Sequence, residues 1–522
     1  MLPCTCRFFF CPKMKYMKIF KAWQFSGEIP IKFVQILGSQ LPVGIQSFAL
    51  LLRPLRSPAV QLPARQPRRT LKPSPAAPQN PTMAAAGATG AAAAAPQPPR
   101  MFKLDPQSEL RVEVPPDAPL RVRLVAGTAE IFGTELPPEG WVPVPPRSKI
   151  AIFTWHGATV ELDGVSESEY TSDETPMVIY VNTHAILDAR RARARAAAAQ
   201  GGDLEASQGP RVIVVGPTDS GKSTLCKMLL SWAAKQGWKP TYVDLDIGQG
   251  SITIPGCISA TPIEKPIDIV DGIPLEMPIA YFYGHPNPSI NPDVYKALMK
   301  ELAQTLETQF SGNAESRAAG MVINTMGWVE GLGYELLLNA IETFKANVVL
   351  VLGQEKLWKM LKDAVQSKPN IDVVKLHKSE GVVLRNSKYR QKTRSFRIKE
   401  YFYGIANDLA PHSNVVNFSD VSVYKIGSGH QAPRSALPIG AEPVADPTRL
   451  VAVNISTDMV HTVLAVSYAK EPDEISSSNV AGFIHVTDVD IQRKKLTYIA
   501  PCPGDLPSRL LIASSLTWYE AL

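Results

Sequence analysis

The sequence predicts an α/β protein with a central P-loop, doubly wound parallel sheet. An N-terminal β-sandwich and a smaller C-terminal mixed, β-rich domain flank it. Three observations carry this prediction. The β-branched run Val212–Val215 leads into the pattern Gly216-x-x-x-x-Gly221-Lys222-Ser223 and then into a helical pattern. Strand and helix candidates alternate after it, and the segments that flank this central region alternate polar and apolar residues with the period of a strand.

Length and composition indicate a globular protein of several domains. A chain of 522 residues is too long for one core, and 45% hydrophobic with 20% charged residues is typical of folded domains. No apolar run is long enough to span a bilayer, so we expect no membrane partner. Three of the six cysteines crowd the N-terminus and none forms a C-x-x-C pair, which favours a reducing compartment without structural zinc.

The net charge of +6 is distributed unevenly along the chain. Residues 1–82 contain 12 Lys and Arg but one acid, so they carry +11 and the remainder carries −5. The bulk charge of the folded part therefore does not argue for nucleic-acid binding, and a local basic patch would have to provide it.

Residues 1–100 are predicted to lie outside the folded domains. The first 82 combine scarce acids with clustered proline and arginine, and Met83 opens an Ala/Pro tract typical of a disordered N-terminus. We favour an upstream extension that is not part of the folded protein, and an organelle transit peptide is the alternative.

Short segments of period 2 predict a β-sandwich over residues 101–195. Examples are ELRVEV, LRVRLVAG, KIAIFTW and TVELDG, none of which carries a helical stripe. The Arg/Ala-rich run from Asp188 to Gln200 predicts a helix that closes this region.

The P-loop domain is predicted over residues 196–397, from alternating strand and helix candidates. The strand candidates are Val212–Val215, Thr241–Leu245, Gly320–Asn324, Asn347–Leu352 and Ile371–Leu376. The helix candidates are Leu225–Gln236, Asp293–Glu307, Tyr334–Ala346 and Glu355–Ala364. Residues 398–522 return to short strands and predict the third domain: Val415–Phe418, Val421–Ile426, Leu450–Val453, Gly482–Asp488 and Lys495–Ile499.

The P-loop pattern predicts a nucleoside triphosphate site. Its glycines let successive backbone N–H groups turn toward the β-phosphate, and the next helix adds partial positive charge. Lys222 would reach the β- and γ-phosphates, and the Ser223 hydroxyl would hold Mg²⁺. The alternative is a chance glycine-rich turn, which would leave the preceding strand, the Lys-Ser pair and the following helix unexplained.

Two carboxylates follow the next predicted strand, in Asp244-Leu-Asp246. An Asp-x-Asp pair at a strand's end places both side chains on one face beside the P-loop. A carboxylate there can hold Mg²⁺ through water or accept the proton of an attacking hydroxyl. We expect Asp246 in that role because it lies nearer the strand's end, and we expect only Asp244 to cap the following turn.

Residues 381–399 form an acid-free run of four arginines and three lysines. A solvated helix face is the common explanation of such a run. Its position after the last strand of the nucleotide domain favours a lid instead. Arginines over a transferring phosphoryl group are worth roughly 10³–10⁵ in rate in P-loop enzymes.

Trp328 follows a buried strand in the segment NTMGW, so its indole is expected at the ligand-binding edge of the sheet. Ordinary packing would explain it. At the mouth of a phosphate site, with Gly327 clearing space, it could also stack on a base.

Together these segments resemble the Clp-type polynucleotide 5′-hydroxyl kinases, a family unrelated to the Clp protease. The resemblance covers roughly residues 101–522. It rests on GPTDSGKST, DLDIGQGSITIPG, NTMGW, the RNSKYR lid with KEYFYG, and the N-terminal AEIFGTEL and KIAIFTWHG. It implies the P-loop subunit of a nuclear pre-mRNA cleavage factor, which acts before polyadenylation and is held by a scaffold subunit on the nucleotide domain. In some lineages the family also phosphorylates RNA 5′ ends.

The resemblance implies roles for matching residues. Those that would hold ATP with Mg²⁺ are the P-loop residues Asp219, Ser220, Gly221, Lys222, Ser223 and Thr224, with Glu109 and Lys149 near the base. Those that would act on the RNA end are Asp246 as the acid near the attacking hydroxyl, Trp328 as a clasp, and Arg385 and Arg390 as a lid pair.

One segment departs from the family's pattern. In active relatives a threonine partners the tryptophan shortly after the strand that ends in YFYG. Here the stretch reads His285-Pro286-Asn287-Pro288, so the hydroxyl is missing unless Asn287 substitutes for it. Two functions stay open: an RNA 5′-hydroxyl kinase, which the lid arginines favour, and a scaffold that holds ATP without turnover, which Pro286 favours.

Overall fold

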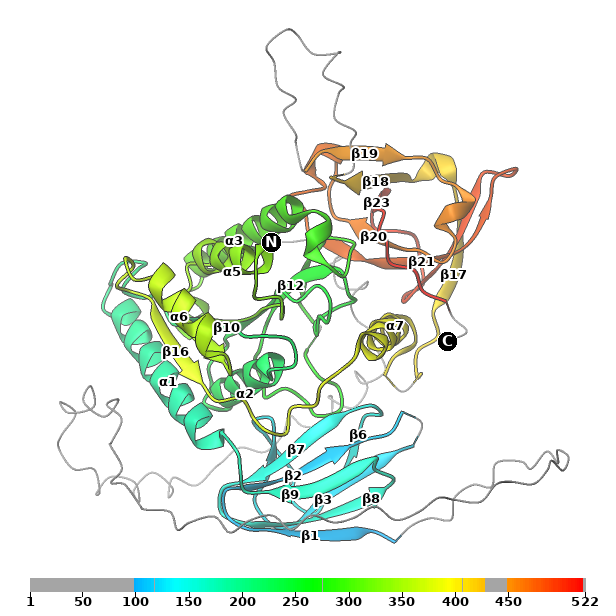
Figure 1. Cartoon of the computed structure of the whole chain (residues 1–522). Helices are drawn as coiled ribbons and strands as arrows, with labels where there is room; N and C mark the ends of the chain where they lie inside the picture. The colour runs from blue at the N-terminus through cyan, green and yellow to red at the C-terminus, as the bar shows by residue number, and fades with distance from the viewer. Residues whose placement is uncertain (1–97, 117, 275, 406, 428–447, 520–522) are drawn as a thin grey trace, which may run out of the picture. The chain divides into compact units, whose positions relative to one another are not determined.

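The computed structural model describes residues 98–116, 118–274, 276–405, 407–427 and 448–519 (Figure 1). Residues 1–97 of the predicted N-terminal extension lie outside them. The described residues form an N-terminal β-sandwich, a central α/β domain and a C-terminal β-rich domain, which confirms the predicted fold class. None of the helices in this part of the chain has both the length and the apolar character needed to cross a membrane.

The N-terminal domain consists of two antiparallel sheets packed face to face. One has the order β1 (Arg100–Leu104), β8 (Ala158–Gly164), β3 (Leu120–Gly127), β6 (Trp141–Val144). The other has the order β5 (Thr134–Glu135), β4 (Glu130–Ile131), β7 (Lys149–Thr154), β2 (Ser108–Glu113), β9 (Ser168–Ser172). Alternate residues of both sheets, such as Leu110, Val122, Ile152 and Val160, fill the space between them.

Helix α1 is longer than the sequence predicts, since it spans Met177–Ala199 and not only the Arg/Ala-rich run. Its buried residues are spaced three and four apart, which is the period of a helix: Met177, Tyr180, His184, Leu187, Arg191 and Ala194. The β-branched residues of its first turns obscured this stripe in the sequence.

The central sheet has seven strands in the order β13-β12-β11-β14-β10-β15-β16. Their bounds are β10 (Arg211–Val215), β11 (Thr241–Asp244), β12 (Cys257–Pro262), β13 (Ile279–Phe282), β14 (Met321–Asn324), β15 (Val348–Leu352) and β16 (Asp372–Leu376). Five strands are parallel, as predicted. Two further strands, β12 and β13, add antiparallel at one edge and make the sheet mixed. Antiparallel neighbours need no crossover helix, and the connections before them contain none.

Helices cover both faces of this sheet. Val212 and Val214 of β10 face α1 and α2 (Lys222–Lys235). Ile213 and Val215 face the other layer, which is formed by α3 (Pro292–Gly312), α5 (Leu332–Thr343) and α6 (Glu355–Ala364). The short helix α4 (Ala314–Ala319) precedes β14. Because both faces are covered, β10 is apolar from Val212 to Val215, and ligands of such a sheet bind beyond the carboxyl ends of its strands.

The C-terminal domain is a seven-stranded sheet in the order β17-β22-β21-β20-β23-β18-β19. Its strands are β17 (His412–Asn417), β18 (Ser422–Ile426), β19 (Leu450–Val453), β20 (Val463–Ser467), β21 (Val480–Asp490), β22 (Lys495–Ala500) and β23 (Leu510–Ile512). Helix α7 (Ser387–Tyr403) packs against it through Phe402, whose ring stacks on Trp518 at 5.8 Å. The domain boundary placed after residue 397 falls inside α7, so the last turns of this helix belong to the C-terminal core.

Candidate active site

The P-loop joins the end of β10 to the start of α2 at the carboxyl edge of the central sheet. Two of its residues have left-handed backbone conformations, Asp219 at φ 54° and Gly221, the N-cap of α2, at φ 89°. This conformation costs energy in a residue other than glycine, so the surroundings of Asp219 must hold it there. The loop leaves the first N–H groups of α2 available for an anion.

Lys222 is buried, and its ammonium donates to the loop's own carbonyls, Gly216 at 2.9 Å and Pro217 at 2.8 Å. Burial lowers the pKa of Lys222 to about 8, although the carboxylate of Asp246 favours the charged form. The Ser220 hydroxyl is buried without a hydrogen-bond partner among the described residues. Buried donors of this kind fit an oxyanion such as a phosphate.

Oxygen donors from three elements meet beside the P-loop and fit a magnesium ion. Ser223 Oγ lies 3.4 Å from Asn324 Oδ1, and Asn324 Nδ2 donates to Asp244 Oδ1 at 3.0 Å. The neighbouring P-loop residue, Thr224, is half-buried in the first turn of α2. Mg²⁺ prefers such oxygens and is usually shared with phosphates and water. In the described part of the chain no group of three His, Cys, Asp or Glu side chains could hold a metal alone.

Both carboxylates of the Asp-x-Asp pair cap the turn that follows β11. Asp244 Oδ2 accepts the N–H and the hydroxyl of Ser251 at 2.8 and 2.7 Å, as predicted. The expectation that Asp246 has no capping role is wrong, because its Oδ1 accepts the N–H groups of Gly248 and Gln249, each at 3.0 Å. The glycine-containing turn brings both N–H groups within reach.

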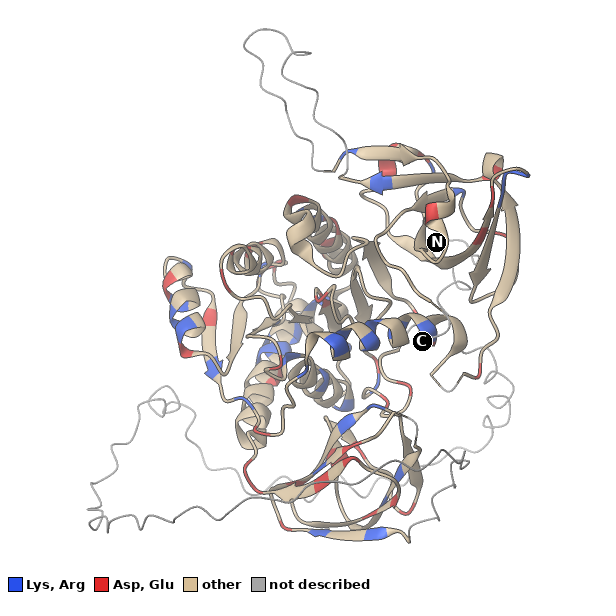
Figure 2. Cartoon of the chain, turned by 45° about the vertical axis from the view of Figure 1, so that its right-hand side comes forward, with Lys and Arg blue, Asp and Glu red and all other residues tan. Residues whose placement is uncertain are grey.

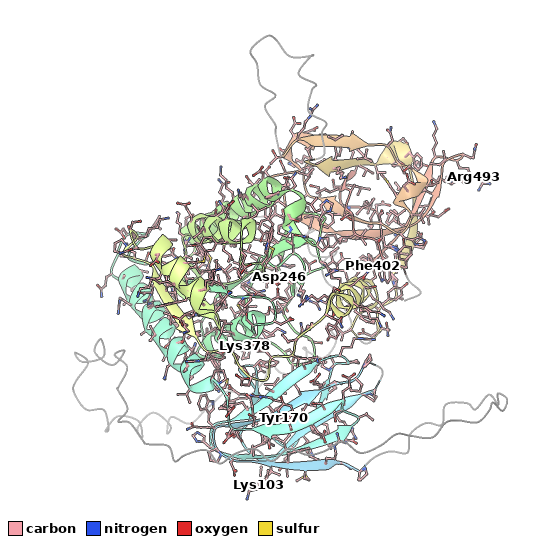
Figure 3. The ribbon with its side chains drawn as sticks, viewed as in Figure 1. Lys103, Tyr170, Asp246, Lys378, Phe402 and Arg493 are labelled. Atoms are coloured by element: carbon pink, nitrogen blue, oxygen red, sulfur yellow. The ribbon has the colours of Figure 1, made fainter. Side chains whose placement is uncertain are left out.

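The other oxygen of Asp246, Oδ2, accepts no hydrogen bond from the described residues and remains available for chemistry. Asp246 lies at the carboxyl edge of the sheet on the side of α7 (Figure 3). Burial and the neighbouring charge of Asp244 raise the pKa of Asp246 to about 6, against the attraction of Lys222. The site therefore contains a carboxylate that binds a proton more readily than an exposed aspartate does.

The predicted lid is helical, and it is tied to the P-loop. Asp219 Oδ2 accepts the backbone N–H of Arg385 at 2.9 Å and the Nη2 of Arg390 at 2.7 Å. The guanidinium of Arg385 lies over the Tyr389 ring, 5.6 Å from its centroid. Of the predicted lid pair, the structure thus brings the side chain of Arg390 to the P-loop, whereas Arg385 reaches it through its backbone.

Two further arginines of the basic run share the face of Arg390 on α7. Arg394 and Arg397 follow at spacings of four and three, so all three lie on one side of the helix. Burial and the charge of Arg390 lower the pKa of Arg394, while Asp246 opposes the shift, so Arg394 lies near both groups. Figure 2 shows that Lys and Arg positions, coloured blue, recur along α7. The spacing of four and three between these arginines in the basic run was the sequence signal that could have identified this face.

Trp328 lies in the loop between β14 and α5, beside the P-loop. Its half-buried indole packs on Gly333, where an added Cβ would lie 2.6 Å from the ring. The preceding Gly327 is in tight contact with Thr218 of the P-loop, whose hydroxyl donates to the Gly327 carbonyl at 3.3 Å. The predicted clearing role of Gly327 thus corresponds to a close approach of two loops.

The two residues expected near the base are not brought together. Glu109 lies opposite Phe153 in the β2–β7 ladder, and Lys149 lies opposite Glu113, four positions along the strand. With the rise per residue of a β-strand, four positions place the two residues roughly 13 Å apart along the strand direction. Glu109 is buried and accepts from Arg111 at 2.6 Å, and Lys149 forms an ion pair with Glu113.

Glu109 is connected to the P-loop through Arg111. An added Cβ on Gly381 would lie 2.6 Å from Arg111 Nε, so the guanidinium packs on the segment that joins β16 to α7. The next residue, Val382, packs on Gly221 of the P-loop. The base end and the phosphate end therefore contact the same connecting segment.

The segment that departs from the family's clasp lies beside the turn of Asp246. An added Cβ on Gly248 would lie 3.1 Å from the Pro286 carbonyl and 3.4 Å from Asp246 Oδ1. Asn287 Oδ1 accepts the N–H of Ser289 at 3.0 Å and caps a short 3₁₀ turn. Its amide oxygen is therefore engaged in local structure.

Three family profiles match consecutive parts of the chain. They are the N-terminal beta-sandwich domain of polyadenylation factor (residues 103–194), the mRNA cleavage and polyadenylation factor CLP1 P-loop (216–404) and the pre-mRNA cleavage complex II protein Clp1 (409–520). These matches cover all three parts of the fold, including the lid.

Relatives and solved structures agree with this assignment. The Arabidopsis thaliana protein CLP1 homolog is 64% identical over 81% of this chain and 95% of its own length. The Gallus gallus polyribonucleotide 5′-hydroxyl-kinase Clp1 is 42% identical over 80% and 96%. A solved structure of the interface between Pcf11p and Clp1p has the same fold, with a TM-score of 0.69 at 24% identity over 81% of this chain and 99% of that one. With the P-loop at its centre, this chain belongs to the CLP1 family of pre-mRNA cleavage and polyadenylation factors.

Proposed function

We propose that this protein binds ATP with Mg²⁺ in the P-loop and transfers the γ-phosphoryl group to the 5′-hydroxyl of RNA. One observation carries the proposal: Arg390 of the lid contacts Asp219 of the P-loop at 2.7 Å, and Arg394 follows one turn later on the same face of α7. Cations of the lid and a carboxylate thus enclose the place where a P-loop presents the γ-phosphate.

Each group has a role in the transfer. The 5′ oxygen forms a bond to the γ-phosphorus, the bond to the bridging oxygen breaks, and the hydroxyl proton passes to Asp246 as ADP leaves. Lys222 and Arg390 would balance the charge of the phosphates, and Ser223 and Asp246 would hold Mg²⁺, the latter through water. When bound, Mg²⁺ supplies further charge neutralisation on the phosphate oxygens.

We also propose that the protein acts in the nucleus as a subunit of the cleavage factor. Vertebrate relatives carry the name polyribonucleotide 5′-hydroxyl-kinase, and the solved relatives are complexes of Clp1p with Pcf11p. A Pcf11-like scaffold subunit is therefore the partner we expect, docked on the central domain, with the 5′ end of RNA as substrate.

A second function is favoured by the segment His285–Pro288. It lacks the clasp hydroxyl, and the oxygen of Asn287 is engaged in the turn cap. With a weakened hold on RNA, the protein would keep ATP without turnover and act as a nucleotide-stabilised scaffold for its partners.

The two functions differ in one measurement. Purified protein is incubated with Mg²⁺, ATP labelled at the γ-phosphate and a 5′-hydroxyl RNA, with Lys222→Ala as the control. We expect label on the RNA 5′ end in the wild type only. ATP binding without label transfer would refute the kinase and leave the scaffold, and absence of ATP binding would refute both.

A further inference from the structure

We infer that the open edge of the central sheet is a docking edge for an extended, acidic segment of a partner protein, which adds to β16 as an eighth strand. The two edges of the sheet differ. The β13 edge is covered by the C-terminal domain, where Phe282 contacts Phe483 at 5.5 Å. Strand β16 pairs with β15 alone in the described chain, and four of its five residues are half-buried or exposed.

The backbone of β16 has hydrogen-bonding groups directed outward. Asp372 N–H donates to Asn347, and the Leu376 carbonyl accepts from Gly353, so residues 372, 374 and 376 bond inward to β15. In a parallel strand the alternate residues, Val373 and Lys375, then point their N–H and C=O groups to the open edge. The outward Val373 carbonyl accepts from the indole of Trp358 at 3.3 Å. The remaining outward groups form the pattern that an added polypeptide strand satisfies in register.

Helix α1 runs alongside this edge on one face of the sheet (Figure 1). The Tyr180 hydroxyl donates to the His377 carbonyl at 2.7 Å at one end of β16, and Arg190 forms an ion pair with Asp372 at the other. Helix α1 therefore runs alongside β16 in the opposite direction, and the side of α1 that carries Arg190 overhangs the open edge.

That overhanging side of α1 is apolar. Ile179 and Ile186 are seven residues apart and lie on the side of Arg190, which follows Ile186 by four. Ile179 is 39% exposed, Ile186 is 60% exposed, and Val374 on the same face of β16 is 38% exposed. An added strand would cover these three side chains with its own alternate residues.

Helix α6 borders the docking edge on the opposite face of the sheet. Trp358 is half-buried, and its indole bonds the outward carbonyl of Val373. The ammonium of Lys362 lies over the same ring, 4.9 Å from its centroid. An added strand would therefore have apolar contacts on both faces, as a central strand of an α/β sheet does.

The charges beside the docking edge indicate which kind of chain would bind there. Asp372 and Glu355 are already paired with Arg190 and Lys375, whereas Arg193 and Lys362 are exposed and form no ion pair in the described residues. Carboxylates that flank an apolar extended segment would complement these cations. A second copy of this chain would bring like charges together, and the chain's own residues 1–82 carry +11. Charge thus disfavours both of these occupants.

The inference rests on the proposed assembly role and not on phosphoryl transfer. The test uses the full chain and the Pcf11-like subunit, with hydrogen exchange resolved to single amides and affinity by calorimetry. We expect the amides of Val373 and Lys375 to exchange fast in the free protein and at least tenfold more slowly in the complex. Lys375→Pro removes an outward N–H and keeps the inward bonds, so affinity should fall at least tenfold.

Matched variants distinguish a specific loss of the docking edge from a general loss of folding. Lys375→Ala loses the same ion pair but keeps the N–H, and should bind within about threefold of wild type. Ile186→Ser should weaken binding, whereas Leu204→Ser, also 60% exposed but in a loop, should not. Unchanged exchange of both amides in a formed complex would overturn the inference, as would wild-type affinity of Lys375→Pro. Protection that appears in the protein alone and grows with its concentration would assign the edge to self-association, and no complex at all would refute the assembly role itself.

Discussion

The phosphate end and the base end of the proposed ATP site are built differently. At the phosphate end, buried and half-buried groups from the P-loop, β11, β14 and α7 are joined to one another by hydrogen bonds. Lys222 donates to carbonyls of its own loop, and the buried Ser220 hydroxyl has no partner among the described residues. At the base end, Glu109 and Lys149 lie four strand positions apart and each is already engaged in an ion pair. The phosphate end is preorganised for a ligand, and the base end is organised as part of a β-sandwich.

This difference indicates where the binding energy resides. Preorganised buried donors contribute strongly when a charged ligand arrives, because their desolvation has already been incurred in folding. Residues that must leave an existing ion pair contribute less, because each new contact replaces an old one. We therefore expect variants at the phosphate end to have far larger effects than variants at the base end.

The largest effect is expected for Lys222→Ala. Without the ammonium, the β- and γ-phosphate charge is uncompensated in a buried site, and ATP affinity should fall at least about 100-fold. Lys235→Ala, at the exposed end of the same helix, is the control and should bind ATP normally. Calorimetry measures both, and wild-type affinity in Lys222→Ala would refute the P-loop assignment.

Arg390→Ala should reduce turnover by roughly 10³ while ATP affinity changes little, because the lid contacts the group in transfer more strongly than the ground-state nucleotide. Arg385→Ala should act in the same direction. Steady-state kinetics with 5′-hydroxyl RNA separates kcat from KM. A rise in KM for ATP with unchanged kcat would show that the lid binds ATP but does not contribute to the transfer step.

Asp246→Asn should reduce turnover by roughly 10² to 10⁴, since an amide cannot take the hydroxyl proton. The amide oxygen can still cap the turn of Gly248 and Gln249, so the fold should be retained. Single-turnover phosphorylation, with thermal unfolding as the control, tests this. If the protein is a scaffold, this variant and the lid variants leave partner binding unchanged.

The contrast between the two ends also shows what could be predicted from the sequence. The P-loop, the parallel strands and the basic run beside the P-loop were predictable because short contiguous motifs encode them. The capping by Asp246, the ladder separation of Glu109 and Lys149, and the contact of Arg390 with Asp219 depend on turns and on pairings between distant segments. The three-arginine face of α7 lies between these cases, since helical spacing would have identified it once the run was known to be a helix.

Variants at the base end should have small effects. Glu109→Gln removes the charge that pairs with Arg111, and we expect ATP affinity to fall less than about tenfold. The loss should be greater than for Lys149→Ala, because Arg111 packs on the segment that continues to the P-loop, whereas Lys149 forms its ion pair with Glu113 across the strand pair. A loss comparable to that of Lys222→Ala would show that the base end is preorganised as well.

The smallest effect, and a gain of function, is expected for Asn287→Thr. The threonine would return a hydroxyl to the segment beside Asp246, and its oxygen can accept the N–H of Ser289 in place of the amide. One added hydrogen bond to RNA is worth about 1 kcal/mol, so KM for 5′-hydroxyl RNA should fall by about fivefold with ATP affinity unchanged. Asn287→Val, which has the same shape without the hydroxyl, is the matched control. If both variants have the wild-type KM, the departure at His285–Pro288 does not limit RNA binding, and the main observation in favour of the scaffold is lost.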